Sequence, residues 1–156
     1  MTTIADASLN PNERETTMRF MVIMLPGEQA EAGVMPDEKI LTAMGRYNEE
    51  LVKAGVLLAG EGLLPSSKGV RVSFEGGKPR VSDGPFVEAK EVIGGFWIFQ
   101  VKSKEEAVEW VKRCPVVGPE QIEIRQIAEP EDFGAALTPE LREAEERLRA
   151  QVETKK

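Results

Sequence analysis

The amino-acid sequence predicts an α+β fold in which strands pack against two amphipathic helices. Three observations support this class. Apolar runs of strand length alternate with segments of helical periodicity, a Gly-Gly pair joins two short alternating runs, and Pro or Gly closes most segments. The chain has 156 residues, of which 41% are hydrophobic, so it is long enough to bury the core of one domain.

The first half predicts a β-α-β unit. Residues 19–25 (RFMVIML) are apolar almost without interruption, which is typical of a strand buried on both faces. Residues 37–54 predict a helix, because Asp37 can cap its first turn and Gly55 can take the left-handed conformation after its last. Residues 56–64 (VLLAGEGLL) then predict a second strand.

A β-hairpin follows. Residues 70–75 alternate between apolar and polar side chains, as in a half-buried strand. Gly76 and Gly77 supply the positive φ angles of a two-residue turn. The return strand, residues 78–82, contains Pro79, so we expect it at a sheet edge.

The second half repeats the first pattern. Residues 92–101 (VIGGFWIFQV) form the strongest predicted strand, and Ser103 with Glu106 predicts a capping box for a helix that ends near Cys114. Residues 120–128 predict the last strand. The complete order is a ferredoxin-like split βαβ fold with an inserted hairpin. Two helices on one face leave the other face of the sheet uncovered, and a second subunit is its simplest cover.

The two ends differ from the body in composition. Residues 1–17 are polar and predict a disordered arm, residues 18–136 form the predicted domain, and residues 137–156 predict a C-terminal helix capped by Thr138. The apolar stripe of this helix is thin. A solvated helix that frays and an arm that locks a dimer are both consistent with that pattern.

The composition excludes several classes of function. Acidic residues outnumber basic ones 27 to 20, and the net charge of −7 argues against a general nucleic-acid-binding protein. The chain has no histidine, so imidazole catalysis and imidazole metal ligation are excluded. Gly60-Glu61-Gly62 lacks the lysine of a phosphate loop, and no carboxylate spacing predicts a metal site, so we expect neither cofactor nor metal.

Location is predicted from the same composition. No apolar run approaches the roughly 20 residues of a membrane span, and the first residues lack the pattern of a secretory signal. One cysteine, Cys114, excludes an internal disulfide and suits a reducing compartment. We therefore expect a cytoplasmic protein that does not enter the membrane.

Residues 83–101 (DGPFVEAKEVIGGFWIFQV) resemble the signature of the YCII-related family, in its DGPF-motif branch. The resemblance continues through residues 18–24, 57–66, 103–115 and 122–127. It covers roughly residues 18–130 in order, which makes it far more specific than one tetrapeptide.

The resemblance implies a dimeric α/β barrel type of ferredoxin-like fold, in which two sheets pack face to face around an interior cavity. Related members resemble muconolactone-isomerase-type and dehalogenase-type enzymes, and some carry a His–Asp pair. Genes of the DGPF branch often lie beside those of extracytoplasmic-function sigma factors. Because this chain has no histidine, only the acidic half of that pair has a counterpart, at Asp83.

Asp83 is the candidate catalytic acid or base. It follows a predicted edge strand and precedes Gly84-Pro85, so its carboxylate can project over the mouth of a cavity. An apolar pocket would raise its pKa towards the range that suits a general acid. The alternative is a structural Asp83 that accepts a hydrogen bond from its own backbone two residues on, as in many Asp-Gly turns.

A set of further residues is expected to bind a ligand. Trp97 would wall an apolar cavity, Lys90 would hold a carboxylate, and Arg125 would anchor an anion. Gly94 and Gly95 lie inside a strand, where paired glycines mark the close approach of a ligand or another backbone. Phe86, in the motif itself, completes the set. Solvated loops, core packing and a cross-strand salt bridge are the structural alternatives.

Three functions follow as hypotheses. The first is a small-molecule-binding homodimer with an accessory or regulatory role linked to sigma-factor signalling. The second is a small lyase, isomerase or dehalogenase that uses Asp83 as its single acid or base. The third is a protein-interaction module. Whether the chain is an enzyme stays open at this point.

Overall fold

The computed structural model describes residues 17–86, 92–116 and 120–155. The chain divides into two units, Met1–Gln126 and Ile127–Lys156. A four-stranded antiparallel sheet in the order β2-β5-β1-β6 forms the centre of the first unit. The arm expected over residues 1–17 lies outside the described residues except for Thr17.

The elements follow the predicted order closely. The strands of the sheet are β1 (Met18–Leu25), β2 (Leu57–Gly62), β5 (Gly95–Val101) and β6 (Gln121–Gln126). The helices of this unit are α2 (Glu28–Glu31), α3 (Glu38–Lys53) and α4 (Lys104–Lys112), with a 3₁₀ turn at Ser66–Lys68. The predicted α+β, ferredoxin-like fold class is thereby confirmed. Within one chain the sheet stays open, with β2 and β6 at its edges.

Local capping explains where the helices begin and end. The Asp37 carboxylate accepts a hydrogen bond from the Ile40 amide at 2.8 Å at the start of α3. Gly55 follows the helix with a φ of +72°, as predicted for a left-handed residue beyond a helix end. The Ser103 hydroxyl accepts from the Glu106 amide at 3.1 Å and begins α4.

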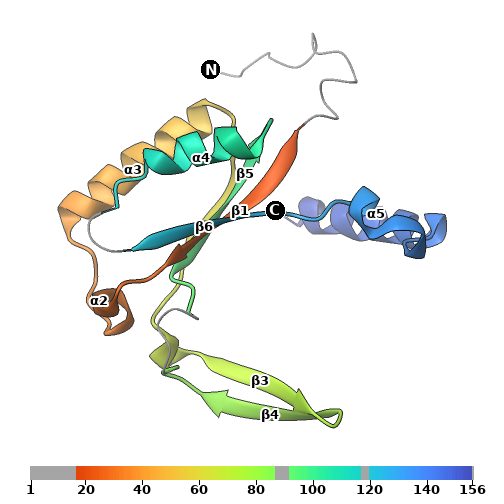
Figure 1. Cartoon of the computed structure of the whole chain (residues 1–156), viewed down its shortest axis with the longest axis horizontal. Coiled ribbons are helices and arrows are strands. Elements are labelled where there is room, and N and C mark those ends of the chain that lie inside the picture. The colour runs from red at the N-terminus through yellow and green to blue at the C-terminus, as the bar shows by residue number, and fades with distance from the viewer. Residues whose placement is uncertain (1–16, 87–91, 117–119, 156) are drawn as a thin grey trace. The chain divides into compact units, whose positions relative to one another are not determined.

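The core lies between one face of the sheet and the two long helices. Figure 1 shows α3 and α4 along the same face. Every second residue of β1 and β5 points to this face, and Phe20 and Phe99, which are paired across the strands, are almost fully buried. The buried residues of the core are Phe20, Val22, Tyr47, Leu51, Val56, Trp97, Phe99, Val101 and Ala107.

The opposite face of the sheet carries apolar side chains that α3 and α4 do not cover. Met21 pairs with Ile98, and Ile23 pairs with Phe96, so the four side chains form one patch in the middle of this face. Three of them are half-buried, and Ile23 is buried. The uncovered face predicted from the sequence is therefore apolar at its centre.

The inserted hairpin forms a separate two-stranded sheet. Its strands are β3 (Val70–Glu75) and β4 (Lys78–Asp83), joined by Gly76 and Gly77 with φ angles of +57° and +80°. Both positive angles match the predicted turn. The pairing places the apolar side chains on one face, and they are all exposed: Val70, Val72, Phe74, Pro79 and Val81.

The second unit holds a 3₁₀ segment, Pro130–Ala136, and the helix α5, Pro139–Thr154. The Thr138 hydroxyl accepts from the Leu141 amide at 3.3 Å and caps α5. Two ion pairs with i, i+4 spacing, Glu143–Arg147 and Glu145–Arg149, lie along this helix at 3.3 and 2.9 Å. Over the described residues, no helix is long and apolar enough to cross a membrane.

Candidate functional site

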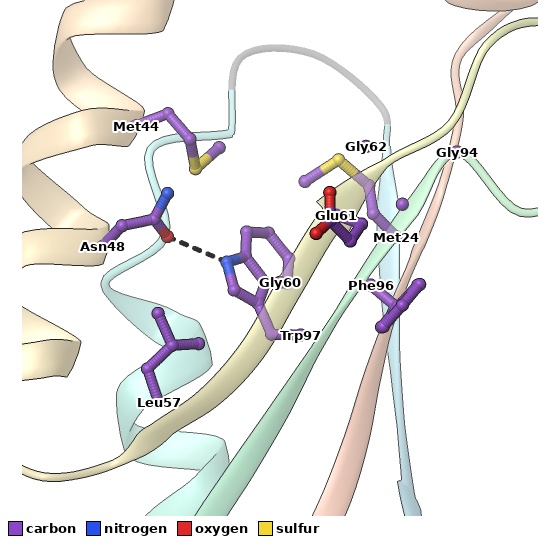
Figure 2. Close-up of a pocket in the computed structure, with 11 residues that line it drawn as sticks. Met24, Met44, Asn48, Leu57, Gly60, Glu61, Gly62, Gly94, Phe96 and Trp97 are labelled. Carbon is purple, nitrogen blue, oxygen red and sulfur yellow. Dashed lines mark hydrogen bonds between the residues drawn. The ribbon is translucent and has the colours of Figure 1, made fainter. Parts of the chain in front are cut away.

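A pocket of about 310 Å³ lies between α3 and the β2–β5 side of the sheet (Figure 2). Helix α3 contributes Met44 and Asn48, and strand β1 contributes Met24. The remaining lining residues come from β2, β5 and the approach to β5: Leu57, Gly60, Glu61, Gly62, Gly94, Gly95, Phe96 and Trp97. The volume is near the lower end of the range of about 300–1,000 Å³ that is usual for small-molecule sites.

Trp97 forms a rigid wall of this pocket. Its side chain is only 8% exposed, and its indole Nε1–H donates to the Oδ1 atom of Asn48 at 2.9 Å. The ring of Tyr47 packs edge-on against the indole, with centroids 6.1 Å apart and planes at 87°. A directional bond and an aromatic contact therefore hold the ring in one orientation.

Glycines give the backbone and the indole the room that this arrangement needs. A Cβ atom at Gly60 would lie 3.0 Å from Cδ1 of Trp97, and one at Gly95 would lie 3.0 Å from the Glu61 carbonyl oxygen. At Gly94 the neighbour is the side chain of Pro26, also at 3.0 Å. The close approach expected at Gly94 and Gly95 is made by this chain's own atoms.

The pocket is nearly free of charge. Among its described lining residues, Glu61 is the sole ionisable one; it is exposed, and its pairing with Phe96, next to that of Gly60 with Trp97, directs its side chain to the opposite face of the sheet. Two thioethers, from Met24 and Met44, add soft apolar surface beside the indole. No group of three or more His, Cys, Asp or Glu residues within the described parts of the chain is arranged to hold a metal ion.

The structure places the residues predicted for the site at several locations. Trp97, Gly94 and Gly95 line the pocket. Arg125 is exposed on the other face of the sheet, where it pairs with Glu123 of its own strand at 3.7 Å rather than across strands. Lys90 lies outside the described residues, as does the rest of residues 87–91.

Asp83 is the exposed last residue of β4 and is not one of the pocket's lining residues. The hydrogen bond considered for it, to its own backbone two residues on, has no donor, because that position is Pro85. Next in the motif, the ring of Phe86 stacks under the Arg71 guanidinium at 3.8 Å.

The DGPF motif, residues 83–86, anchors the base of the hairpin through hydrogen bonds of its backbone amides. The buried Ser66 donates from its amide and its hydroxyl to the Glu31 carboxylate, at 2.7 and 2.5 Å, and its hydroxyl accepts from the Phe86 amide at 3.1 Å. These two bonds from Ser66, the hydroxyl bond first, hold the pKa of Glu31 below its usual value. The Gly84 amide donates to the Gly69 carbonyl at 2.9 Å.

Two further titratable groups lie in or beside the core. Burial is the main cause that raises the pKa of Tyr47, whose hydroxyl donates to the Trp110 carbonyl at 2.8 Å. Burial also raises the pKa of the Cys114 thiol to about 11. The thiol is thus an inert part of the core edge rather than a nucleophile.

We expect Cys114 to be alkylated by iodoacetamide at pH 8 about tenfold more slowly in the folded chain than in urea. The raised pKa lowers the thiolate fraction about 100-fold, and the greater nucleophilicity of a more basic thiolate offsets about half of this on a logarithmic scale. Since the unfolded thiol loses its proton first, Cys114 stabilises the fold below pH 9 and this contribution is lost as the pH rises towards 11. Equal alkylation rates in both states would contradict the buried thiol.

Comparison with known proteins agrees with the family resemblance seen in the sequence. The model of the YCII-related domain matches residues 18–131, which is most of the chain. The chain belongs to the YCII-related family. It is also 28% identical over 94 residues to an uncharacterised protein of Rhizobium meliloti (strain 1021), an alignment that covers 59% of this chain and 76% of that protein.

Sequence reasoning missed two polar residues of this YCII-related pocket, Asn48 and Glu61. Asn48 follows Met44 by four residues, so it lies beside the apolar stripe of α3, and a polar residue at that spacing is the signal that could have found it. Glu61 was considered only as part of a phosphate loop. Its place at the pocket depends on the pairing of β2 with β5, which no local pattern reveals.

Proposed function

We propose that this YCII-related chain binds a small organic molecule in the pocket between α3 and the β2–β5 side of the sheet, and that it does so as a homodimer. One observation carries the first part. Trp97 is held by a hydrogen bond and an aromatic contact in an orientation that walls a partly apolar pocket of about 310 Å³. A preformed wall of this kind is typical of ligand sites.

The proposed role is accessory or regulatory. The resemblance of residues 83–101 to the DGPF branch supports a link to sigma-factor signalling, because genes of that branch often neighbour sigma-factor genes. The enzyme alternative, with Asp83 as acid or base, receives less support from the geometry. Asp83 is exposed and is not among the residues that line the pocket, so a substrate held against Trp97 has no described contact with it.

Two apolar surfaces that α3 and α4 do not cover support the homodimer. One is the patch of Met21, Ile23, Phe96 and Ile98 on the uncovered face of the sheet. The other is the apolar face of the hairpin, where Phe74 is 73% exposed and Val81 is 65% exposed. A two-stranded hairpin is marginally stable in water by itself, so its apolar face favours a cover. A second copy of the chain is the cover that the resemblance implies.

Native mass spectrometry of gently purified protein tests both parts at once. We expect the mass of a dimer with an additional few hundred daltons that is lost under denaturing conditions. Trp97→Ala is expected to lose the additional mass and keep the dimer, because it removes the pocket wall but no residue of the two apolar surfaces. Phe74→Ser is expected to shift the dimer towards the monomer.

Matched variants define the outcomes of this experiment. Trp110→Ala is the control for Trp97→Ala, since Trp110 does not line the pocket. Phe133→Ser, in the second unit, is the control for Phe74→Ser at a similarly exposed ring. A ligand retained by Trp97→Ala would contradict the pocket, and a monomeric wild-type chain would contradict the homodimer.

A further inference from the structure

The uncovered face of the sheet, which lies away from α3 and α4 (Figure 1), carries charged side chains on its two edge strands. Strand pairing arranges this face in two neighbouring rows, each of which crosses all four strands. The first row consists of Ala59, Ile98, Met21 and Arg125. The second row consists of Glu61, Phe96, Ile23 and Glu123. Alternate residues of a strand are about 7 Å apart, and this distance separates the rows. The apolar patch is therefore flanked by Glu61 on β2 and by Glu123 and Arg125 on β6.

A second copy of the chain can cover this face in two aligned ways. A homodimer of two-fold symmetry uses the same surface on both chains, and aligned sheets keep their strands within about 30° of each other. The two-fold axis through the centre of the patch then runs either along the strands or across them. Both arrangements place apolar side chains against apolar side chains, so the patch itself does not distinguish them.

The charges on β6 favour an axis across the strands. In that arrangement the two rows exchange places, so Arg125 lies over the partner's Glu123, and Glu123 lies over the partner's Arg125. An axis along the strands instead places β2 over the partner's β6, where Glu61 would meet the partner's Glu123 and repel it. Orthogonal packing, the other common class, takes Arg125 away from the partner's Glu123. The axis across the strands thus gives each charged group on β6 an opposite charge.

The Glu123–Arg125 pair also gains from this contact. Within one chain the two groups are 3.7 Å apart on the same strand, with side chains that are 53% and 72% exposed. Such an exposed pair contributes little to stability by itself. Two copies would join the four groups into one alternating cluster, in which each side chain has an opposite charge in its own chain and another in the partner. The result is a self-complementary polar rim beside the apolar patch.

We infer that two copies of the chain pack their uncovered faces together with the two-fold axis across the strands, so that Glu123 and Arg125 of each chain bind Arg125 and Glu123 of the other. This inference rests on the proposed function, because it defines the orientation of the proposed homodimer. It assigns to Arg125 a role in the interface instead of the anion anchor that the sequence predicts.

Two single charge reversals of the full-length chain test this orientation, Glu123→Arg and Arg125→Glu. The first places two arginines over two arginines, and the second places two glutamates over two glutamates. We expect each homodimer to dissociate about tenfold more readily than the wild type in analytical ultracentrifugation. An equimolar mixture should form the heterodimer in preference, since two arginines then face two glutamates. Native mass spectrometry identifies the heterodimer by its mass.

Matched variants separate a contact between chains from one within the chain. The double variant, Glu123→Arg with Arg125→Glu, should restore dimerisation nearly to that of the wild type. Glu49→Lys and Lys53→Glu break a similarly exposed pair on α3, 4.0 Å apart, and their mixture should contain only the statistical share of heterodimer. Glu61→Arg should leave the dimer unchanged, because this side chain would lie over the partner's Ala59.

The outcomes separate this inference from the proposed homodimer. A wild-type chain that stays monomeric would overturn both. A wild-type dimer whose two single variants dimerise normally and mix at the statistical ratio would overturn the orientation and leave the homodimer. A dimer that is strengthened by Glu61→Arg would indicate the axis along the strands and would likewise overturn the inference.

Discussion

Replacing Gly84 with alanine is expected to destabilise the fold by about 3 kcal/mol or more, near the top of the range for overpacking. A Cβ atom at this position would lie 1.8 Å from the carbonyl oxygen of Ser66 and 2.7 Å from its carbonyl carbon. Both are backbone atoms, so no side chain can rotate away, and the chain itself must move. The melting temperature should fall by roughly 10 °C.

The movement would also break the hydrogen bonds that fasten the hairpin. Ser66 donates to Glu31 and accepts from the Phe86 amide, and both bonds require its backbone to stay where it is. Urea unfolding measures the loss. Gly69→Ala is the matched control, because its φ of −110° suits alanine and its nearest contact would be 3.5 Å. Equal stability of the two variants would contradict the close approach of Gly84 to Ser66.

Replacing Phe99 with alanine is expected to destabilise the fold by about 3–5 kcal/mol, which is a large share of the stability of an ordinary domain. Phe99 is 0% exposed and lies in the central strand β5, where it pairs with Phe20 of β1 and Leu57 of β2. Its removal leaves a cavity between the sheet and the helices that the neighbouring strands cannot close.

Chemical denaturation followed by circular dichroism measures this effect. Phe133→Ala serves as the control for the loss of an aromatic ring, because Phe133 is 58% exposed in the second unit, and we expect a change within about 0.5 kcal/mol. Phe99→Leu should cost about 1.5 kcal/mol, since it fills most of the same space. A Phe99→Ala variant as stable as Phe133→Ala would show that the core is not where the burial pattern places it.

The order of helices and strands could be predicted from the sequence because short-range signals define it. Asp37 and Gly55 mark the ends of α3, and Gly76 with Gly77 marks the hairpin turn, each through a backbone requirement that involves only a few neighbours. The predicted strand at residues 92–101 was too long, because β5 begins at Gly95. Gly94 precedes it, packed against the side chain of Pro26.

The residues of the candidate site were harder to predict from the sequence than the fold. Trp97, Gly94 and Gly95 were predicted for the site and line the pocket, because an aromatic residue and a glycine pair in a strand are visible in the sequence. Asp83, in the motif, and Arg125, in the last predicted strand, were expected to be charged residues of the site. Strand pairing places Asp83 opposite Val70 in the hairpin and Arg125 opposite Met21, on the face of the sheet away from Trp97. The charge of a residue does not by itself reveal on which sheet, or on which face of a sheet, its side chain lies.

By itself, the sequence determined the α+β class, the positions of the strands and of the three longer helices, and the absence of imidazole chemistry. These follow from side-chain periodicity, from capping and turn residues, and from composition. Only the tertiary structure decided that Asn48 of α3 meets Trp97 of β5. That meeting depends on how helix and sheet pack, so it joins residues 49 positions apart through contacts that no local pattern encodes.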